Sequence, residues 1–96
     1  MTVLVYSERA LRDLERLSRF LGEREPATAT ATARLIVSAL DMLRAHPQVG
    51  RPVEHPLREL VISRGRTGYV ALYVYDELTD MATVHAIRHQ REAGYR

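Results

Sequence analysis

Hydrophobic and polar positions follow two different periods along the chain, and these periods divide it into elements. Thr2–Tyr6 is a short apolar, β-branched run, which predicts a strand. Beyond it, leucines recur every three to four residues, as in an amphipathic helix: Leu11, Leu14, Leu17 and Leu21. Ser7 is a suitable N-cap and Gly22 a suitable C-cap, so the first helix is predicted over Glu8–Leu21.

The next segment alternates Ala and Thr over Ala27–Ala33, a period of two that is also typical of a strand. We favour a helix, because Pro26 suits a first helical turn and Ala is the best helix former. The apolar register beyond it is helical throughout: Ala29, Ala33, Ile36, Leu40 and Leu43. A second helix is therefore predicted over Pro26–Ala45, ending before Pro47. The short link Gly22–Glu25 makes the two helices an antiparallel hairpin.

Three strand candidates follow a connector rich in Pro and Gly, His46–Pro56. These candidates are Leu57–Ser63, Tyr69–Tyr75 and Ala82–Arg88. Turn residues separate them at close spacing, which predicts an antiparallel meander. The order β-α-α-β-β-β indicates one α+β domain over residues 1–96, with the N-terminal strand first and the helix hairpin packed on an antiparallel sheet.

Composition and charge narrow the chemistry. The 96 residues carry 14 basic and 12 acidic side chains, and the net charge of +2 is too small to establish nucleic-acid binding by itself. Every cation is Arg, which stays charged and can bind phosphate or carboxylate bidentately. Cys is absent, which excludes a disulfide framework, Cys-ligated zinc and thiol nucleophiles. The sequence shows no apolar run long enough for a membrane span and no signal-peptide core. We therefore expect a cytoplasmic protein, and we expect it to need no metal or cofactor.

Several short motifs recur in order along nearly the whole chain. They are Ser7–Leu14, His46-Pro47, Gly50–Pro52, Leu57–Val61, Tyr69 with Leu72-Tyr73, and Ile87–Tyr95. In order and spacing they resemble the RelE/ParE superfamily of type II toxin–antitoxin toxins, and more closely its ParE-like, plasmid-stabilisation branch. The resemblance implies a small toxin neutralised by a cognate antitoxin, in a toxin–antitoxin hetero-oligomer, with no membrane partner.

The resemblance implies one of two activities. RelE-like members bind the ribosomal A site and cleave mRNA without a metal, whereas ParE-like members have no nuclease activity and poison DNA gyrase. The RelE-like pattern places an Arg directly after the Tyr of the central strand and further cations on the strand before it. Here Val70 follows Tyr69, and Leu60–Ser63 contains no cation. Losing such an electrostatic clamp costs about 3–4 kcal/mol in a transition state. We therefore expect a gyrase inhibitor rather than an enzyme; mRNA cleavage by the basic tail is the alternative.

Candidate site residues fall in three groups. If the chain is a nuclease, the catalytic candidates are His89, Arg91 and Tyr95. A phosphate or a target could be contacted by Arg64, Arg66, Arg88 and Arg91. The first helix offers an antitoxin or target surface at Arg9, Arg12 and Arg16. A solvated tail, a charged turn and a solvated helix face are the simpler interpretations of these groups. The tyrosines of the central strand share one face, which is either core or an RNA-stacking platform: Tyr69, Tyr73 and Tyr75.

Overall fold

Helices and strands follow the predicted order in the computed structural model, which describes residues 1–22, 26–62 and 68–92. The helices are α1 (Glu8–Gly22) and α2 (Pro26–Asp41), and a short 3-10 turn, η1 (Met42–Arg44), extends the second one. The strands are β1 (Val3–Tyr6), β2 (Arg51–Pro52), β3 (Leu57–Ile62), β4 (Tyr69–Asp76) and β5 (Met81–His89). The α+β prediction is confirmed, and β2 adds a short strand inside the predicted connector.

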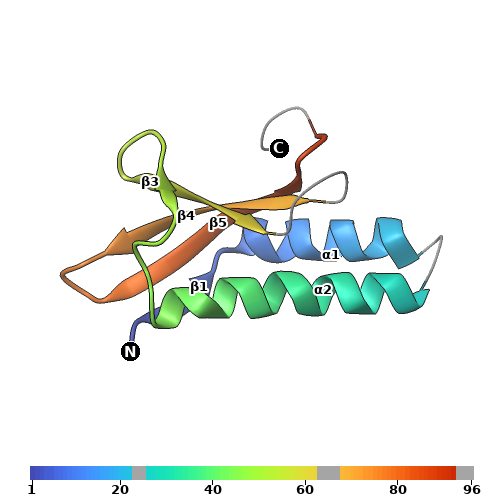
Figure 1. The fold of residues 1–96 in the computed structure, drawn as a ribbon, viewed down its shortest axis with the longest axis horizontal. Helices are drawn as coiled ribbons and strands as arrows, with labels where there is room; N and C mark the ends of the chain where they lie inside the picture. The colour runs from blue at the N-terminus through green and yellow to red at the C-terminus, as the bar shows by residue number, and fades with distance from the viewer. Residues whose placement is uncertain (23–25, 63–67, 93–96) are drawn as a thin grey trace.

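The strands form one sheet in the order β1-β5-β4-β3-β2, and the two helices lie side by side against one of its faces (Figure 1). The meander pairs β3, β4 and β5 antiparallel, as predicted. β1 pairs with β5 in parallel, with Val3 opposite Met81 and Tyr6 opposite Val84, so the sheet as a whole is mixed. None of the helices in the described ranges is long and apolar enough to span a membrane.

The first helix begins at the predicted cap, since the Ser7 hydroxyl accepts a hydrogen bond from the Ala10 amide at 3.0 Å. Among the stripe positions Leu11, Leu14 and Leu17, its buried face departs from the leucine stripe at Leu11. Leu11 is 53% exposed, whereas Ala10 and Leu17 are buried and Leu14 packs against the core. The predicted inward position of Leu11 is wrong because the buried face is centred one residue earlier and includes Asp13, which is 7% exposed.

The core lies between the helices and the sheet, and the predicted register of the second helix is confirmed within it. Ile36, Leu40 and Leu43 are almost fully buried. Tyr69 and Tyr73 belong to the same cluster and Tyr75 packs against it, so the shared tyrosine face is core rather than a stacking platform.

Tyr73 also fixes the connector. Its hydroxyl donates to the Pro47 carbonyl and accepts from the Gly50 amide, each at 2.8 Å. A Cβ atom at Gly50 would lie 2.5 Å from the Tyr73 ring, so only glycine leaves room for this close approach.

A β-bulge interrupts the pairing of β4 and β5. Leu72 lies opposite Ala86 and Tyr73 opposite Val84, which leaves His85 as an extra, exposed residue on β5. β1 ends at the same place, where the Ser7 amide donates to the Val84 carbonyl and the Ser7 hydroxyl donates to the His85 carbonyl. From the bulge onward, α1 rather than a strand borders β5 on the edge that faces away from β4.

Candidate functional site

The C-terminal part of β5 continues past β1, and side chains of α1 take the place of the missing strand. The carboxylate of Asp13 accepts a hydrogen bond from the buried Ile87 amide at 2.9 Å. Arg16, one helical turn further, donates to the Ile87 carbonyl at 3.5 Å. Both backbone groups of Ile87 therefore have partners at an edge where β1 does not reach, which is what a buried sheet edge requires.

A carboxylate from the turn after β5 completes this arrangement. Glu92 accepts from the Arg16 guanidinium at 2.8 Å with one oxygen and from the His89 amide at 2.9 Å with the other. Arg16 also lies 3.6 Å from Asp13. The Glu92 side chain is 15% exposed and that of Arg16 is 36% exposed, so solvent screens this pair only in part. We call Asp13, Arg16 and Glu92 the edge clasp.

Arg88 closes the same turn through backbone carbonyls. One terminal nitrogen of its guanidinium donates to the carbonyls of His89, Gln90 and Glu92, each at 3.2 Å. Arg88 lies opposite Val70 in the sheet, on the face that alternation turns away from the helices. Val70 is only 4% exposed, so this position adds a covered apolar side chain beside Arg88.

His89 is held by a ring contact and a backbone hydrogen bond. Its ring stands edge-on to Tyr69, with the centroids 5.2 Å apart and the planes at 87°. Its Nδ1 accepts from the Arg91 amide at 3.0 Å, so the neutral ring carries its proton on Nε2. Nδ1, the one nitrogen that could accept a proton in that tautomer, faces the backbone. In this tautomer Nε2 is the donor nitrogen, and Nδ1 is occupied rather than available as a general base.

The three arginines predicted on the first helix have different environments. Arg12 is exposed and lies 3.9 Å from Glu8, a loose ion pair within the helix. Two guanidinium nitrogens of Arg9, Nε and Nη2, are buried and have no acceptor among the described residues. Arg16 belongs to the edge clasp. Only Arg12 is presented as an open surface cation.

The structure brings part of the predicted site together. Arg88, His89 and Arg91 meet at the end of β5, where Arg16 joins them from α1. Arg64, Arg66 and Tyr95 lie outside the described residues. Sequence reasoning did not identify Asp13 and Glu92. Asp13 did carry a signal, because it falls between Ala10, Leu14 and Leu17 on the buried helical face, where a carboxylate needs a specific partner.

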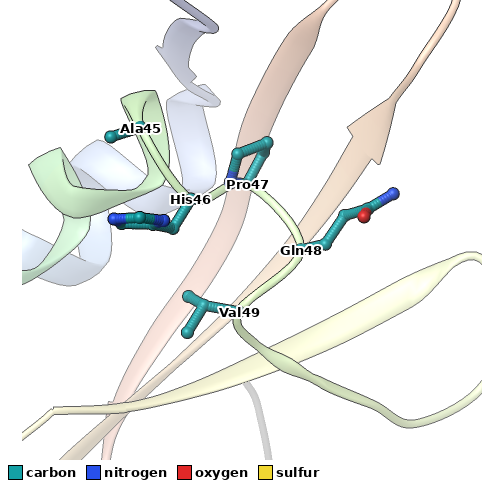
Figure 2. A pocket seen from close by; sticks show the side chains of 5 residues that line it. All are labelled: Ala45, His46, Pro47, Gln48 and Val49. Carbon is teal, nitrogen blue, oxygen red and sulfur yellow. The ribbon is translucent and has the colours of Figure 1, made fainter.

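Neither a surface hollow nor a cluster of metal-ligating side chains supplies a catalytic site among the described residues. A hollow of about 390 Å³ is lined by five consecutive residues, Ala45, His46, Pro47, Gln48 and Val49 (Figure 2). In that view the Gln48 side chain points away from His46 and Val49, and Gln48 donates to Glu77 instead. Across the ranges that the structure describes, no three His, Asp or Glu side chains gather as they would around a metal ion.

An acidic centre lies at the opposite end of β5, where the strand begins. Asp80 accepts hydrogen bonds from the Thr2 hydroxyl at 2.7 Å and from the Tyr75 hydroxyl at 2.8 Å. These two bonds, the Thr2 bond first, hold the pKa of Asp80 below its ordinary value. The Asp80 carbonyl accepts from the Val3 amide, so this residue fixes the start of β1 on the sheet.

Comparison with known proteins places these features in a family context. The sequence-family model described as the ParE toxin of the type II toxin–antitoxin system parDE matches residues 4–94 of this chain. A relative from Caulobacter vibrioides, Toxin RelE3, is 40% identical over 85 residues, covering 88% of this chain and 89% of the relative. Among solved structures, the chromosomal ParDE system of P. aeruginosa superposes with a TM-score of 0.78 at 22% identity, over 93% of this chain and 96% of that one. The intact E. coli RelBE toxin–antitoxin complex gives 0.71 at 14% identity, over 96% and 100%.

Proposed function

The chain belongs to the ParE toxin family of type II toxin–antitoxin systems, within the RelE/ParE superfamily, and we propose that it poisons DNA gyrase until a cognate antitoxin neutralises it. The proposal has two parts, the choice of gyrase over the ribosome and the binding of an antitoxin. Each part depends on different residues and has its own test.

The environment of Val70 carries the choice of target. In the RelE-like pattern this position of the central strand holds an Arg that grips the scissile phosphate. Here it is an apolar side chain that is 4% exposed, beside an Arg88 that already binds three carbonyls of its own turn. A phosphate at this place would meet no cation from position 70, where the RelE-like pattern supplies one, and prearranged charge is the main source of such catalysis.

The tail offers a binding surface more readily than acid–base chemistry. His89 turns its Nδ1 toward the Arg91 amide, and Arg16 is engaged by Glu92. A gyrase inhibitor needs complementary contacts and no proton transfer, so these engaged side chains are compatible with its role. Arg91, which is exposed, supplies a cation for such a contact.

The antitoxin is proposed to cover the helix hairpin. Four large apolar side chains there are between 41% and 53% exposed: Leu11, Leu35, Val37 and Met42. Arg12, also exposed, could pair with a carboxylate of an acidic partner segment that folds as it binds. An antitoxin that binds the folded toxin and not the unfolded chain should stabilise the folded state by about 2.7 kcal/mol at a ligand concentration 100 times Kd. The melting temperature of the toxin should rise accordingly. An unchanged melting temperature with saturating antitoxin would contradict this part.

The target is tested by adding the purified protein to two assays in parallel. We expect it to inhibit supercoiling and trap cleaved DNA in a gyrase reaction, and to leave mRNA intact in a ribosome reaction. Cleavage of mRNA within codons, with gyrase unaffected, would overturn the gyrase proposal. Protein mixed beforehand with its antitoxin is the control and should inhibit neither reaction.

A RelE-like ribosome-dependent mRNA endonuclease is the second candidate, and the names of the relatives favour it. Both Toxin RelE3 and Toxin RelE1 of Caulobacter vibrioides share 40% identity or more with this chain. If this candidate is right, His89→Ala should abolish mRNA cleavage while the protein remains folded. Unchanged cleavage by that variant would remove His89 from the catalytic set.

A further inference from the structure

The edge clasp connects the helix hairpin to the segment that we assign to target contact, and nothing in the resemblance accounts for it. We propose that Asp13, Arg16 and Glu92 act as positioning residues that hold the segment His89–Glu92 in the geometry in which it meets the target. This inference rests on the proposed function, since it concerns the way in which the toxin presents its tail.

Glu92 is the residue that joins the two parts. Its carboxylate uses one oxygen for the His89 amide within its own segment and the other for Arg16 on α1. Because both bonds involve an ionised group, each is stronger than a neutral hydrogen bond. Movement of the turn away from α1 would break the Arg16 bond, whereas unwinding of the turn would break the His89 bond.

Arg16 is itself held by a second carboxylate. Asp13 lies 3.6 Å from the Arg16 guanidinium and is fixed by the Ile87 amide at 2.9 Å. The contacts therefore form a closed ring, which runs from β5 through Asp13, Arg16 and Glu92 and returns to the chain at His89. A closed ring of this kind restrains the turn better than one exposed ion pair, which is worth about 0–1 kcal/mol.

The groups left to meet a target are those that the closed ring of contacts orients. Arg91 is exposed, and the His89 ring is set against Tyr69 with Nε2 as its donor nitrogen. Arg88 closes the turn from the other side through its carbonyls. The clasp residues need no contact with the target themselves, which distinguishes them from Arg91.

The test is a double-mutant cycle on gyrase inhibition with Glu92→Gln and Arg16→Gln. Glu92→Gln keeps an oxygen for the His89 amide and removes the charge that binds Arg16. We expect each single variant to raise the half-inhibitory concentration about tenfold, equivalent to about 1.4 kcal/mol. The double variant should be no more than slightly weaker than either single one, because both changes open the same ring. Arg16→Lys, which keeps a cation near Glu92, should recover most of the inhibition.

Two controls separate positioning from loss of fold. Glu15→Gln and Arg19→Gln alter an exposed ion pair on the same helix and should leave inhibition unchanged. Amide hydrogen exchange, followed by NMR at a temperature where circular dichroism shows every variant folded, should speed up at His89 in Arg16→Gln and stay unchanged in the Arg19→Gln control.

The outcomes distinguish this inference from the proposed function. Equal inhibition by the wild-type protein and folded Glu92→Gln would overturn the clasp and leave the gyrase proposal standing. Multiplicative losses in the double variant, about a hundredfold in total, would also overturn it, because the two residues would then act independently. A folded wild-type protein that inhibits neither gyrase nor translation would contradict the proposed function, and this inference with it.

Discussion

On the edge that faces away from β4, the two halves of β5 are bordered in different ways. Along Met81–Val84 the neighbour is β1, and backbone groups pair with backbone groups in parallel register. Beyond the bulge at His85 the neighbour is α1, and the amides of Ile87 and His89 are satisfied by carboxylates. The first half therefore needs only strand-compatible residues on β1, whereas the second half needs particular charged side chains in particular places.

This difference determines where in β5 and its neighbours a single substitution removes a backbone hydrogen bond. Side chains on β1 can change without removing a backbone hydrogen bond, since every residue supplies an amide and a carbonyl. A carboxylate that satisfies a buried amide has no such substitute. The segment proposed to meet the target thus lies at the end of the sheet where one side-chain change has the greatest consequence.

Removal of the Asp13 carboxylate should break the second half. Asp13→Ala leaves the buried Ile87 amide without an acceptor and should cost about 2–3 kcal/mol of the free energy of unfolding. For a domain of this size, about 4–8 °C of melting temperature accompanies each kcal/mol, so calorimetry should record a fall of roughly 10–20 °C. Glu15→Ala, an exposed change on the same helix, should have little effect. Equal melting temperatures for the two variants would contradict this account.

Tyr73 supports the backbone through hydrogen bonds that involve no charged group, and so it can be compared with the carboxylates that support the second half of β5. Tyr73→Phe removes the partner of the Gly50 amide and of the Pro47 carbonyl, and should cost about 1–2 kcal/mol in urea unfolding. Because no ionised group is lost, the difference between Tyr73→Phe and the wild-type protein should be the same at low and high salt. A clear salt dependence of that difference would count against a neutral anchor.

Salt should affect the two halves of β5 differently. At 1 M sodium chloride the Debye length is about 3 Å, so the Arg16–Glu92 pair should weaken by up to about 1 kcal/mol. The His89 amide should then exchange roughly two- to fivefold faster than at 0.05 M, within the range that this energy allows. The Ser7 amide, which donates to the Val84 carbonyl, is the internal reference and should not change. Parallel acceleration of both amides would remove the distinction.

Lowering the pH should reveal a small electrostatic contribution of Asp80 to the stability of the protein, at the start of the first half of β5. The pKa of Asp80 is lowered below 3.8 in the folded protein, chiefly by the hydrogen bond from Thr2. Its stabilising effect is therefore present above about pH 4 and is lost as the pH falls through the folded-state pKa. Asp80→Asn should flatten this part of a plot of melting temperature against pH, and Asn tolerates the positive φ of 50° at this position. A wild-type slope in the variant would exclude Asp80 as its source. This is the smallest change that we expect.

Local periodicity and capping were sufficient to predict the helices and the meander. The Ser7 cap and the register of Ile36, Leu40 and Leu43 depend on residues within a few positions of one another, which a single sequence displays directly. The parallel pairing of β1 with β5 joins segments from opposite ends of the chain, and no local pattern encodes it. The bulge at His85 also breaks the alternation, so that Val84 and Ile87 are both buried although they are three residues apart.

Sequence alone predicted the site as a set of arginines with His89 and Tyr95, without the carboxylates that pair with them. Arg16 was expected on an open surface, and the structure instead pairs it with Glu92, far away in the sequence. Arg88 was predicted to contact a phosphate or a target, which stays a prediction, and its guanidinium binds nearby carbonyls. The partners of a cation are set by tertiary structure, so the number and spacing of arginines could not distinguish a binding cation from a structural one.

The contact between Gly50 and the Tyr73 ring has a consequence for the sequences that can encode this fold. The two positions share one volume, because a Cβ at position 50 would lie where the ring now is. In a library randomised at both positions and selected for folded protein, the permitted residue at one site should depend on the residue at the other. Glycine at 50 should accompany tyrosine at 73, and any larger residue at 50 should survive only beside a smaller one at 73, so the two sites vary as a single unit.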